Sequence, residues 1–153
     1  MLTKTLLIVY YSENGKTEKM ATNIGKAAEK SGVKVILKKV EDSNLNDLVE
    51  ADGIVVGSPT YFSNVSWQVK KMIDESIALY KTLRSLEKKI GGCFTSAGTR
   101  KDGEDCLKML ELALLHHKIT LVPGIVCESK DEETDILQTC LEYGTRIAKQ
   151  LTA

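Results

Sequence analysis

The chain has 153 residues, a length that fits one ordinary domain with a substantial buried core. Hydrophobic residues make up 42% and charged residues 27%, which indicates a globular protein and excludes a disordered or fibrous one. The 21 basic side chains balance the 21 acidic ones, and this neutrality argues against a broad nucleic-acid-binding face. We therefore expect a single domain over residues 1–153, with no nucleic-acid partner.

The sequence also gives an expectation for the compartment. The longest apolar runs, such as Leu6–Tyr11, are too short to cross a bilayer, and the N-terminus lacks the pattern of a secretory signal. Cys93, Cys106, Cys127 and Cys140 are widely spaced and form no Cys-x-x-Cys pair. Such cysteines are typical of reduced, mostly buried thiols. We expect a cytoplasmic protein that does not contact a membrane.

The first half of the chain alternates between strand and helix patterns. Residues 5–11 form a continuous apolar run, typical of a central parallel strand that helices cover on both faces. Residues 17–31 show helical spacing and end at Gly32, where a helix C-terminal glycine belongs. Residues 33–40 alternate only partly, which predicts a half-exposed edge strand, and residues 44–50 fit a short crossover helix.

The second half continues this alternation. Residues 53–57 predict a buried strand, and residues 67–80 carry apolar side chains at helical spacing. A fourth strand is expected over 89–95, a helix over 106–117 and a fifth strand over 119–126. The order of elements predicts a sheet whose strands are joined by helices.

The last helix completes the predicted architecture. Ser129-Lys-Asp-Glu132 has the capping-box pattern, and apolar positions then continue to Leu151. The whole pattern predicts an α/β fold, a doubly wound three-layer sandwich with a five-stranded parallel sheet in the order 2-1-3-4-5. Ligands of such sheets bind beyond the carboxyl ends of the strands, at the switch point between strands 1 and 3. The loops expected to form a site are 12–17, 58–66 and 96–103.

The first of these loops suits a phosphate group. It reads Ser12-Glu-Asn-Gly-Lys-Thr17 and precedes a helix whose free N–H groups attract an anion. Gly15 permits close approach of the backbone, and Ser12, Asn14 and Thr17 each have a donor to offer. The alternative is a polar turn with an ordinary helix cap.

Two other ligand classes are disfavoured. Residues 15–17 match the end of a nucleotide P-loop, but Tyr10 stands where that motif needs a glycine, and the loop is too short for a triphosphate. His116 and His117 are the only histidines, and neither has an acidic or cysteine partner at metal-binding spacing. We expect a monophosphate rather than a triphosphate, no metal, and one histidine that caps or packs at a helix end.

The second loop carries aromatic side chains at its tip. Gly57 and Pro59 predict a stiff turn, and Tyr61 and Phe62 follow it. Aromatic side chains at a switch point can stack on a flat heterocycle. We expect one of the two to fold back onto the following helix, and Phe62 is the better candidate because its side chain has no polar end.

The third loop is built from small residues. Its sequence from residue 95 is Thr-Ser-Ala-Gly-Thr. Small residues leave backbone N–H groups accessible, which suits contact with the carbonyl rim of a ring. On its own this signal is weak.

Four segments of the chain follow one another in the order seen in a known family: residues 10–15, 57–64, 94–99 and 116–123. They resemble the flavodoxin-like FMN-binding proteins, especially the WrbA-type NAD(P)H:quinone oxidoreductases. The resemblance implies a phosphate site formed by Ser12, Asn14, Gly15, Lys16 and Thr17. It implies that the isoalloxazine is flanked by Pro59, Thr60, Tyr61, Phe62 and Asn64, with Thr60 near the reactive nitrogen. It implies that the pyrimidine edge and ribityl chain are held by Thr95, Ser96, Ala97, Gly98 and Thr99. His116 matches a histidine that lies near the flavin, often at a subunit contact.

The sequence also departs from the WrbA-type pattern. Lys16 stands where these proteins commonly have histidine. The chain lacks their inserted segments before the third strand and after the fifth, which support tetramer formation and the nicotinamide and quinone site. FMN binding therefore carries over better than tetramerisation or quinone reduction.

Three functions are compatible with this reading. An FMN-dependent reductase would take electrons from NAD(P)H and pass them to a small-molecule acceptor; the absence of an aromatic residue in the third loop and the neutral charge favour it. The alternatives are a flavodoxin-type carrier between protein partners and a flavin-binding or interaction module without turnover. A homodimer is the simplest assembly, with Tyr61, Phe62 and Trp67 at the contact, unless these side chains are buried within one subunit.

Overall fold

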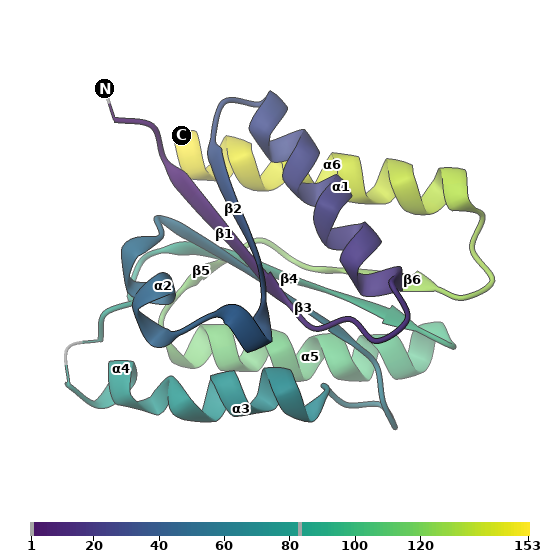
Figure 1. Cartoon of the computed structure of the whole chain (residues 1–153), viewed down its shortest axis with the longest axis horizontal. Helices are drawn as coiled ribbons and strands as arrows, with labels where there is room; N and C mark the ends of the chain where they lie inside the picture. The colour runs from purple at the N-terminus through teal and green to yellow at the C-terminus, as the bar shows by residue number, and fades with distance from the viewer. Residues whose placement is uncertain (1, 83) are drawn as a thin grey trace.

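The computed structural model describes residues 2–82 and 84–153, and its centre is a parallel sheet between two helical layers (Figure 1). The strands run in the order β2-β1-β3-β4-β5, and β6 also pairs with β4. Their bounds are β1 Thr5–Tyr10, β2 Lys34–Lys39, β3 Gly53–Pro59, β4 Ile90–Ala97, β5 Thr120–Leu121 and β6 Ile125–Glu128. The predicted sheet order is confirmed.

Helices cover both faces of the sheet. In Figure 1, α1 and α6 lie on one face, and α3, α4 and α5 lie on the other. The helix bounds are α1 Lys16–Lys30, α2 Leu45–Glu50, α3 Trp67–Glu75, α4 Ile77–Thr82, α5 Arg100–His116 and α6 Glu133–Thr152, with a 3₁₀ turn, η1, at Val40–Asp42.

The central strand β1 explains why two layers form. Leu6 and Ile8 belong to the core under α1 and α6, whereas Leu7 and Val9 belong to the core on the opposite face. All four side chains are at most 1% exposed. Because successive side chains of a strand point to opposite faces, a continuous apolar run is stable only when both faces are covered.

The predicted fifth strand is divided in two. Residues 119–126 become β5 and β6, and the chain leaves the ladder between them. Pro123 has no backbone N–H to donate, and the Gly124 N–H donates to Glu111 Oε2 at 2.9 Å instead of to a strand. Val122 still donates to the Gly91 carbonyl at 2.7 Å, so the interruption is confined to this turn.

Two helix boundaries also differ from the prediction. The helix expected over 67–80 is broken between α3 and α4 at Ser76, whose Oγ donates to the Ile73 carbonyl at 2.6 Å and so competes with the helical ladder. The capping box expected at Ser129–Glu132 does not form, because Asp131 Oδ2 accepts from the Glu128 N–H at 2.8 Å and Glu132 is the N-cap without a side-chain bond. A reciprocal capping box is found at Asn44 of α2.

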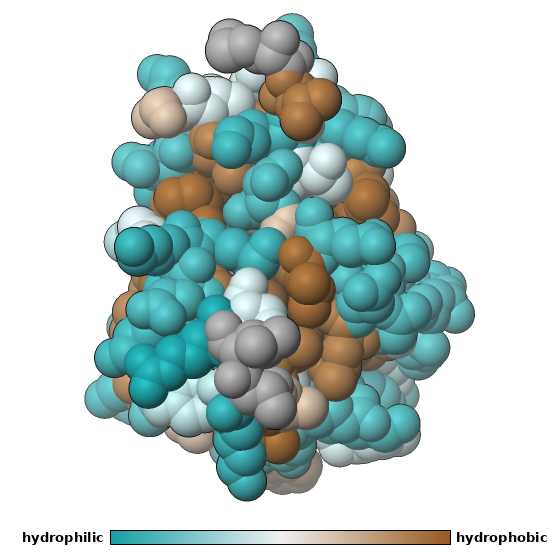
Figure 2. Space-filling view, turned by 90° about the vertical axis from the view of Figure 1, so that its left-hand side faces the viewer, coloured by the Kyte–Doolittle hydropathy of each residue, from teal (hydrophilic) through white to brown (hydrophobic). Residues whose placement is uncertain are grey.

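The strands begin and end on opposite sides of the molecule (Figure 1). The edge where the strands begin carries both chain termini, and hydrophilic residues cover most of it, with smaller apolar areas between them (Figure 2). The strands end at the opposite edge, where the three predicted loops lie. Among the described residues, no helix is long and apolar enough to cross a membrane.

Candidate functional site

A cavity of about 750 Å³ opens at the edge where β1, β3, β4 and β6 end. Eight predicted site residues line it, and they come from all three loops: Asn14, Lys16, Pro59, Thr60, Tyr61, Ser96, Ala97 and Gly98. The topology therefore brings together segments that are separated by more than 80 residues in the sequence. The volume of the cavity lies within the range of small-molecule and cofactor sites.

The first loop presents donors at the N-terminus of α1. Gly15 is the N-cap with φ +91°, a conformation that favours glycine, and an added Cβ would meet nothing within 4 Å. Ser12 Oγ accepts from the N–H groups of Gly15 and Glu18 at 3.2 and 3.1 Å, which leaves its own proton free to donate. The N–H groups of Asn14 and Thr17 donate to no other described residue. This arrangement suits an anion in front of the helix.

The charge of the first loop supports the same ligand. Lys16 lines the cavity, and its ammonium group forms no ion pair with any described residue. Asn14 Oδ1 accepts from the Lys16 N–H at 3.2 Å, so the amide nitrogen of Asn14 is left to donate. A phosphate placed here would meet one cation, several donors and the positive end of the helix dipole.

Buried hydroxyl pairs hold the loops in position. Thr17 Oγ1 lies 2.9 Å from Ser96 Oγ and joins the first loop to the third. Thr60 Oγ1 lies 2.7 Å from Thr95 Oγ1, and the Thr60 N–H donates to the Ser96 carbonyl at 2.9 Å. Thr17 and Thr95 are at most 1% exposed, so their side chains support the cavity from below rather than line it.

Tyr61 is the aromatic side chain of the cavity wall. Its hydroxyl donates to Glu13 Oε2 at 2.6 Å, and its backbone exchanges two hydrogen bonds with Asn64. Burial, followed by the bond to Glu13, raises the pKa of Tyr61 to about 12. The phenol is therefore neutral and donates its proton at physiological pH.

Phe62 does not fold back onto the following helix, so that prediction is wrong. Phe62 and Ser63 adopt φ values of +51° and +64°, and the Phe62 side chain is fully exposed. Ser63 Oγ donates to Asp102 Oδ1 at 2.7 Å, which holds the turn in this conformation and points its tip into solvent. Neither Phe62 nor Asn64 lines the cavity; Asn64 Oδ1 accepts from the Val65 N–H at 2.8 Å.

The third loop is shorter than expected, and Thr99 caps a helix instead of lining the cavity. Ser96 and Ala97 end β4, and α5 begins at Arg100, with Thr99 Oγ1 accepting from the Asp102 N–H as the helix cap. His116 is the last residue of α5, a 17-residue helix that is about 25 Å long at 1.5 Å per residue. His116 does not line the cavity of this chain. Its place near the flavin, at a subunit contact, stays a prediction.

The cavity also has walls that the three loops do not supply. Thirteen further residues line it: Glu13, Lys19, Met20, Asn23, Lys26, Cys127, Glu128, Ser129, Asp131, Glu133, Thr134, Ile136 and Leu137. Most belong to the turn after β6, to the first part of α6 and to the facing side of α1. The turn could have been found from the sequence, since the fifth strand also ends at this edge.

A buried carboxylate belongs to this additional wall. Glu128 is 8% exposed, and its oxygens lie 3.4 Å from Arg100 Nε and 3.5 Å from Lys130 Nζ. The two cations compensate the charge of Glu128, which would otherwise be costly to bury. The described residues contain no group of three or more histidine, cysteine or acidic side chains that could hold a metal ion.

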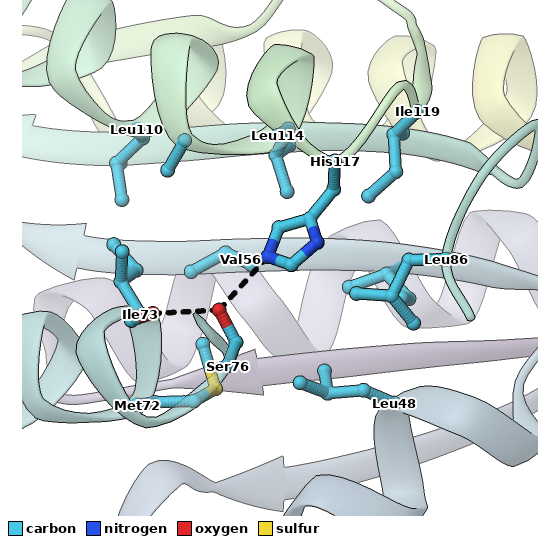
Figure 3. A pocket seen from close by; sticks show the side chains of 12 residues that line it. Leu48, Val56, Met72, Ile73, Ser76, Leu86, Leu110, Leu114, His117 and Ile119 are labelled. Atoms are coloured by element: carbon cyan, nitrogen blue, oxygen red, sulfur yellow. Dashed lines mark hydrogen bonds between the residues drawn. The ribbon is translucent and has the colours of Figure 1, made fainter. Parts of the chain in front are cut away.

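A second cavity, of about 30 Å³, lies under α5 on the opposite side of the sheet from α1 (Figure 3). Its lining is apolar apart from Ser76 and His117, whose Nε2 lies 2.9 Å from Ser76 Oγ. His117 also meets the edge of the Tyr80 ring, with centroids 6.0 Å apart. The expectation that one histidine packs at a helix end is confirmed, and this small cavity serves packing rather than ligand binding.

Known proteins resemble this chain over most of its length. Residues 7–127 match the family model of the flavodoxin domain. A flavodoxin from Clostridium saccharobutylicum is 36% identical over 80% of this chain and 71% of its own. An NAD(P)H dehydrogenase (quinone) from Paracoccus denitrificans is 26% identical over 78% of this chain and 67% of its own.

Solved structures agree with this result. A WrbA-like flavodoxin from Agrobacterium tumefaciens superimposes with a TM-score of 0.83 at 26% identity, over 98% of both chains. A flavodoxin from the domain Archaea gives a TM-score of 0.79 at 28% identity, over 97% of this chain and 99% of its own. With the sheet order and the family match, these likenesses show that the chain belongs to the flavodoxin family of flavin-binding redox proteins.

Proposed function

We propose that the chain binds FMN non-covalently in the large cavity, with the phosphate in front of α1. The support is the set of groups that an anion needs there: the free N–H groups of Asn14 and Thr17, the Ser12 hydroxyl and the Lys16 ammonium group. The isoalloxazine then lies between Tyr61 of the second loop and Ala97 and Gly98 of the third.

The protein's own part in the chemistry is to hold and orient this group. Bound FMN would supply the redox chemistry that amino-acid side chains lack. Tyr61 limits the movement of the ring on one side, and the bond from its hydroxyl to Glu13 fixes the aromatic plane. The Gly98 N–H donates to no other described residue and remains for a carbonyl at the rim of the ring.

Within this class, we propose that the protein is an NAD(P)H-dependent oxidoreductase. The observation that carries this proposal is the composition of the cavity wall, because Tyr61 is the one aromatic side chain among the described residues that line it. With a single aromatic side chain in the wall, the ring would be stacked on one face at most, and the other face would be open to a nicotinamide. The formal net charge of zero is also unlike that of an acidic carrier that docks basic proteins.

A flavodoxin-type electron carrier is the second candidate. Its support is the 36% identity with the Clostridium saccharobutylicum flavodoxin and the exposure of Phe62 and Trp67 near the second loop. Exposed aromatic side chains are frequent anchors of protein contacts. The same two side chains also support the predicted homodimer, which light scattering at increasing protein concentration tests.

An anaerobic absorbance experiment distinguishes the candidates. The FMN-loaded protein is mixed with NADPH or NADH, and the visible absorbance of the oxidised flavin is followed over time. Rapid bleaching supports the oxidoreductase, whereas bleaching only after a reduced protein donor is added supports the carrier. Protein that binds no FMN at all contradicts both and leaves the non-catalytic module.

A further inference from the structure

The large cavity continues beyond the three loops into a groove between α1 and α6, which pack against each other on one face of the sheet (Figure 1). One wall of this groove is formed by Met20, Asn23 and Lys26 of α1, and the other by Ile136 and Leu137 of α6. At 1.5 Å per residue, Asn23 lies about 12 Å along α1 from Gly15. FMN with its phosphate in front of α1 and its ring between the second and third loops leaves this groove free.

Asn23 is the residue of the groove that lacks a partner. It is 9% exposed, and its side-chain amide forms no hydrogen bond with any described residue. A buried amide without a partner is unfavourable, and asparagine is also a poor helix former. The chain therefore gains no stability from this amide, whereas a ligand in the groove would pair with both its donor and its acceptor.

Lys26 supplies a free positive charge to the groove. It is exposed one turn beyond Asn23 on α1, and its ammonium group forms no ion pair or hydrogen bond with a described residue. Lys19, one turn before Asn23, differs because its Nζ lies 3.1 Å from Glu133 Oε1 of α6. Lys26 is thus the groove lysine that is available to an anionic group of a ligand.

The shape of the groove suits a flat, apolar body. The side chains of Met20, Ile136 and Leu137 are apolar, and the ion pair between Lys19 and Glu133 reaches from one helix to the other, which shows that the groove is narrow. Ligand sites commonly combine apolar walls with a few placed polar groups. The amide of an asparagine offers a donor beside an acceptor, which pairs with the N6 and N7 atoms of adenine. With a cation one turn away, these groups match a phosphorylated adenosine.

We propose that the groove binds the adenosine half of NADPH, with the adenine paired to Asn23 and the 2′-phosphate at Lys26. This inference rests on the proposed oxidoreductase function, because the nicotinamide half of the same molecule would reach the flavin ring through the single cavity that Tyr61 and Lys26 both line. NADPH carries the 2′-phosphate and NADH lacks it, so Lys26 would set a preference for NADPH.

Binding of adenosine 2′,5′-bisphosphate tests the site without any redox reaction. Isothermal titration is run with the FMN-loaded and the flavin-free full chain. We expect one bisphosphate per chain in both, bound roughly five-fold more tightly than 5′-AMP. Asn23→Ala should weaken both nucleotides roughly five-fold, whereas Lys26→Gln should remove only the preference for the bisphosphate. Lys30→Gln, on the same helix but outside the cavity, is the matched control and should bind like the unaltered chain.

The outcomes separate this inference from the proposed function. No bisphosphate binding, equal binding by all variants, or displacement of the bisphosphate by FMN overturns the inference. Bisphosphate binding with the expected variant effects, in a chain whose flavin NADPH does not reduce, supports the nucleotide site and contradicts the oxidoreductase. Reduction by NADPH with the same KM in Lys26→Gln and the unaltered chain supports the oxidoreductase and contradicts the role of the groove.

Discussion

The Tyr61 hydroxyl donates a 2.6 Å hydrogen bond to Glu13 Oε2, which joins the second loop to the first across the large cavity. The bond spans 48 residues of sequence and fixes an aromatic ring that is otherwise 37% exposed. A ring held in this way is prepared to stack on a flat ligand without losing much further conformational freedom on binding.

This geometry predicts different effects for two substitutions of Tyr61. Tyr61→Ala removes the ring and should weaken FMN binding by about 1 kcal/mol, roughly five-fold in Kd. Tyr61→Phe retains the ring and should lose less. Quenching of FMN fluorescence measures both values, and equal affinity in Tyr61→Ala and the unaltered chain would mean that the ring stacks on nothing.

For a substitution of Gly15 we predict a loss of FMN binding that can be distinguished from a loss of stability. Gly15→Val places a branched side chain where the phosphate is proposed and should abolish FMN binding. Gly32 offers the matched control, because its φ is +97° and an added Cβ there also meets nothing within 4 Å. Gly32→Val should lower the free energy of unfolding by a similar amount, about 1–2 kcal/mol, and bind FMN normally. Loss of FMN binding in both variants would assign the effect to the fold.

Lys16 predicts a salt-dependent contribution to affinity. Lys16→Gln should weaken FMN binding by about 1 kcal/mol at low ionic strength, since a charge-assisted contact to the phosphate is lost. The difference should shrink as salt is added, because the site is open to solvent. Lys30→Gln at the other end of α1 is the control and should leave the Kd unchanged. Isothermal titration over a range of salt concentrations measures the effect, and a Kd difference that is insensitive to salt would contradict it.

The buried position of His117 predicts how the free energy of unfolding depends on pH. Because Ser76 Oγ donates its single proton to the Ile73 carbonyl, it accepts from His117 Nε2, and the buried Nδ1 is left without a partner among the described residues. Burial, together with the charge of His116, lowers the pKa of His117 below its ordinary value of about 6.5. Below pH ~6.5 the unfolded chain takes up a proton that the folded chain does not, so stability falls as pH drops through this window.

The measurement is the free energy of unfolding by urea between pH about 7.5 and 5.5. The unaltered chain should lose stability toward the acidic end, and His117→Gln should lose less of it over the same interval. His116→Gln, at the exposed neighbouring position, should retain most of the slope. An unchanged slope in His117→Gln would show that other groups control the acid sensitivity.

The elements that could be predicted from the sequence are those with a local cause. The apolar run of β1 requires two covering layers, and Gly15 and Gly32 mark where α1 begins and ends, so the sheet order and the position of the first loop follow from pattern alone. The division of the fifth strand at Pro123 also has a local cause, because proline lacks a backbone N–H to donate. Where the strand leaves the ladder depends on which strand lies beside it, and that is not visible in the sequence.

The features that could not be predicted depend on tertiary contacts. Phe62 is held outward because Ser63 bonds to Asp102 on α5, a contact across 39 residues. Thr95 resembles a ligand contact in sequence, yet it is buried as the partner of Thr60. The wall formed by Cys127 and the first turns of α6 becomes visible only once α6 is placed against α1.

The central claim is that FMN binds at the three loops, and its most direct measurement is a fluorescence titration of FMN with the flavin-free chain, run beside Gly15→Val and Gly32→Val. We predict saturable quenching with one FMN per chain for the unaltered protein and for Gly32→Val, and none for Gly15→Val. Quenching by Gly15→Val equal to that of the unaltered chain, or no quenching by any of the three, would contradict the account.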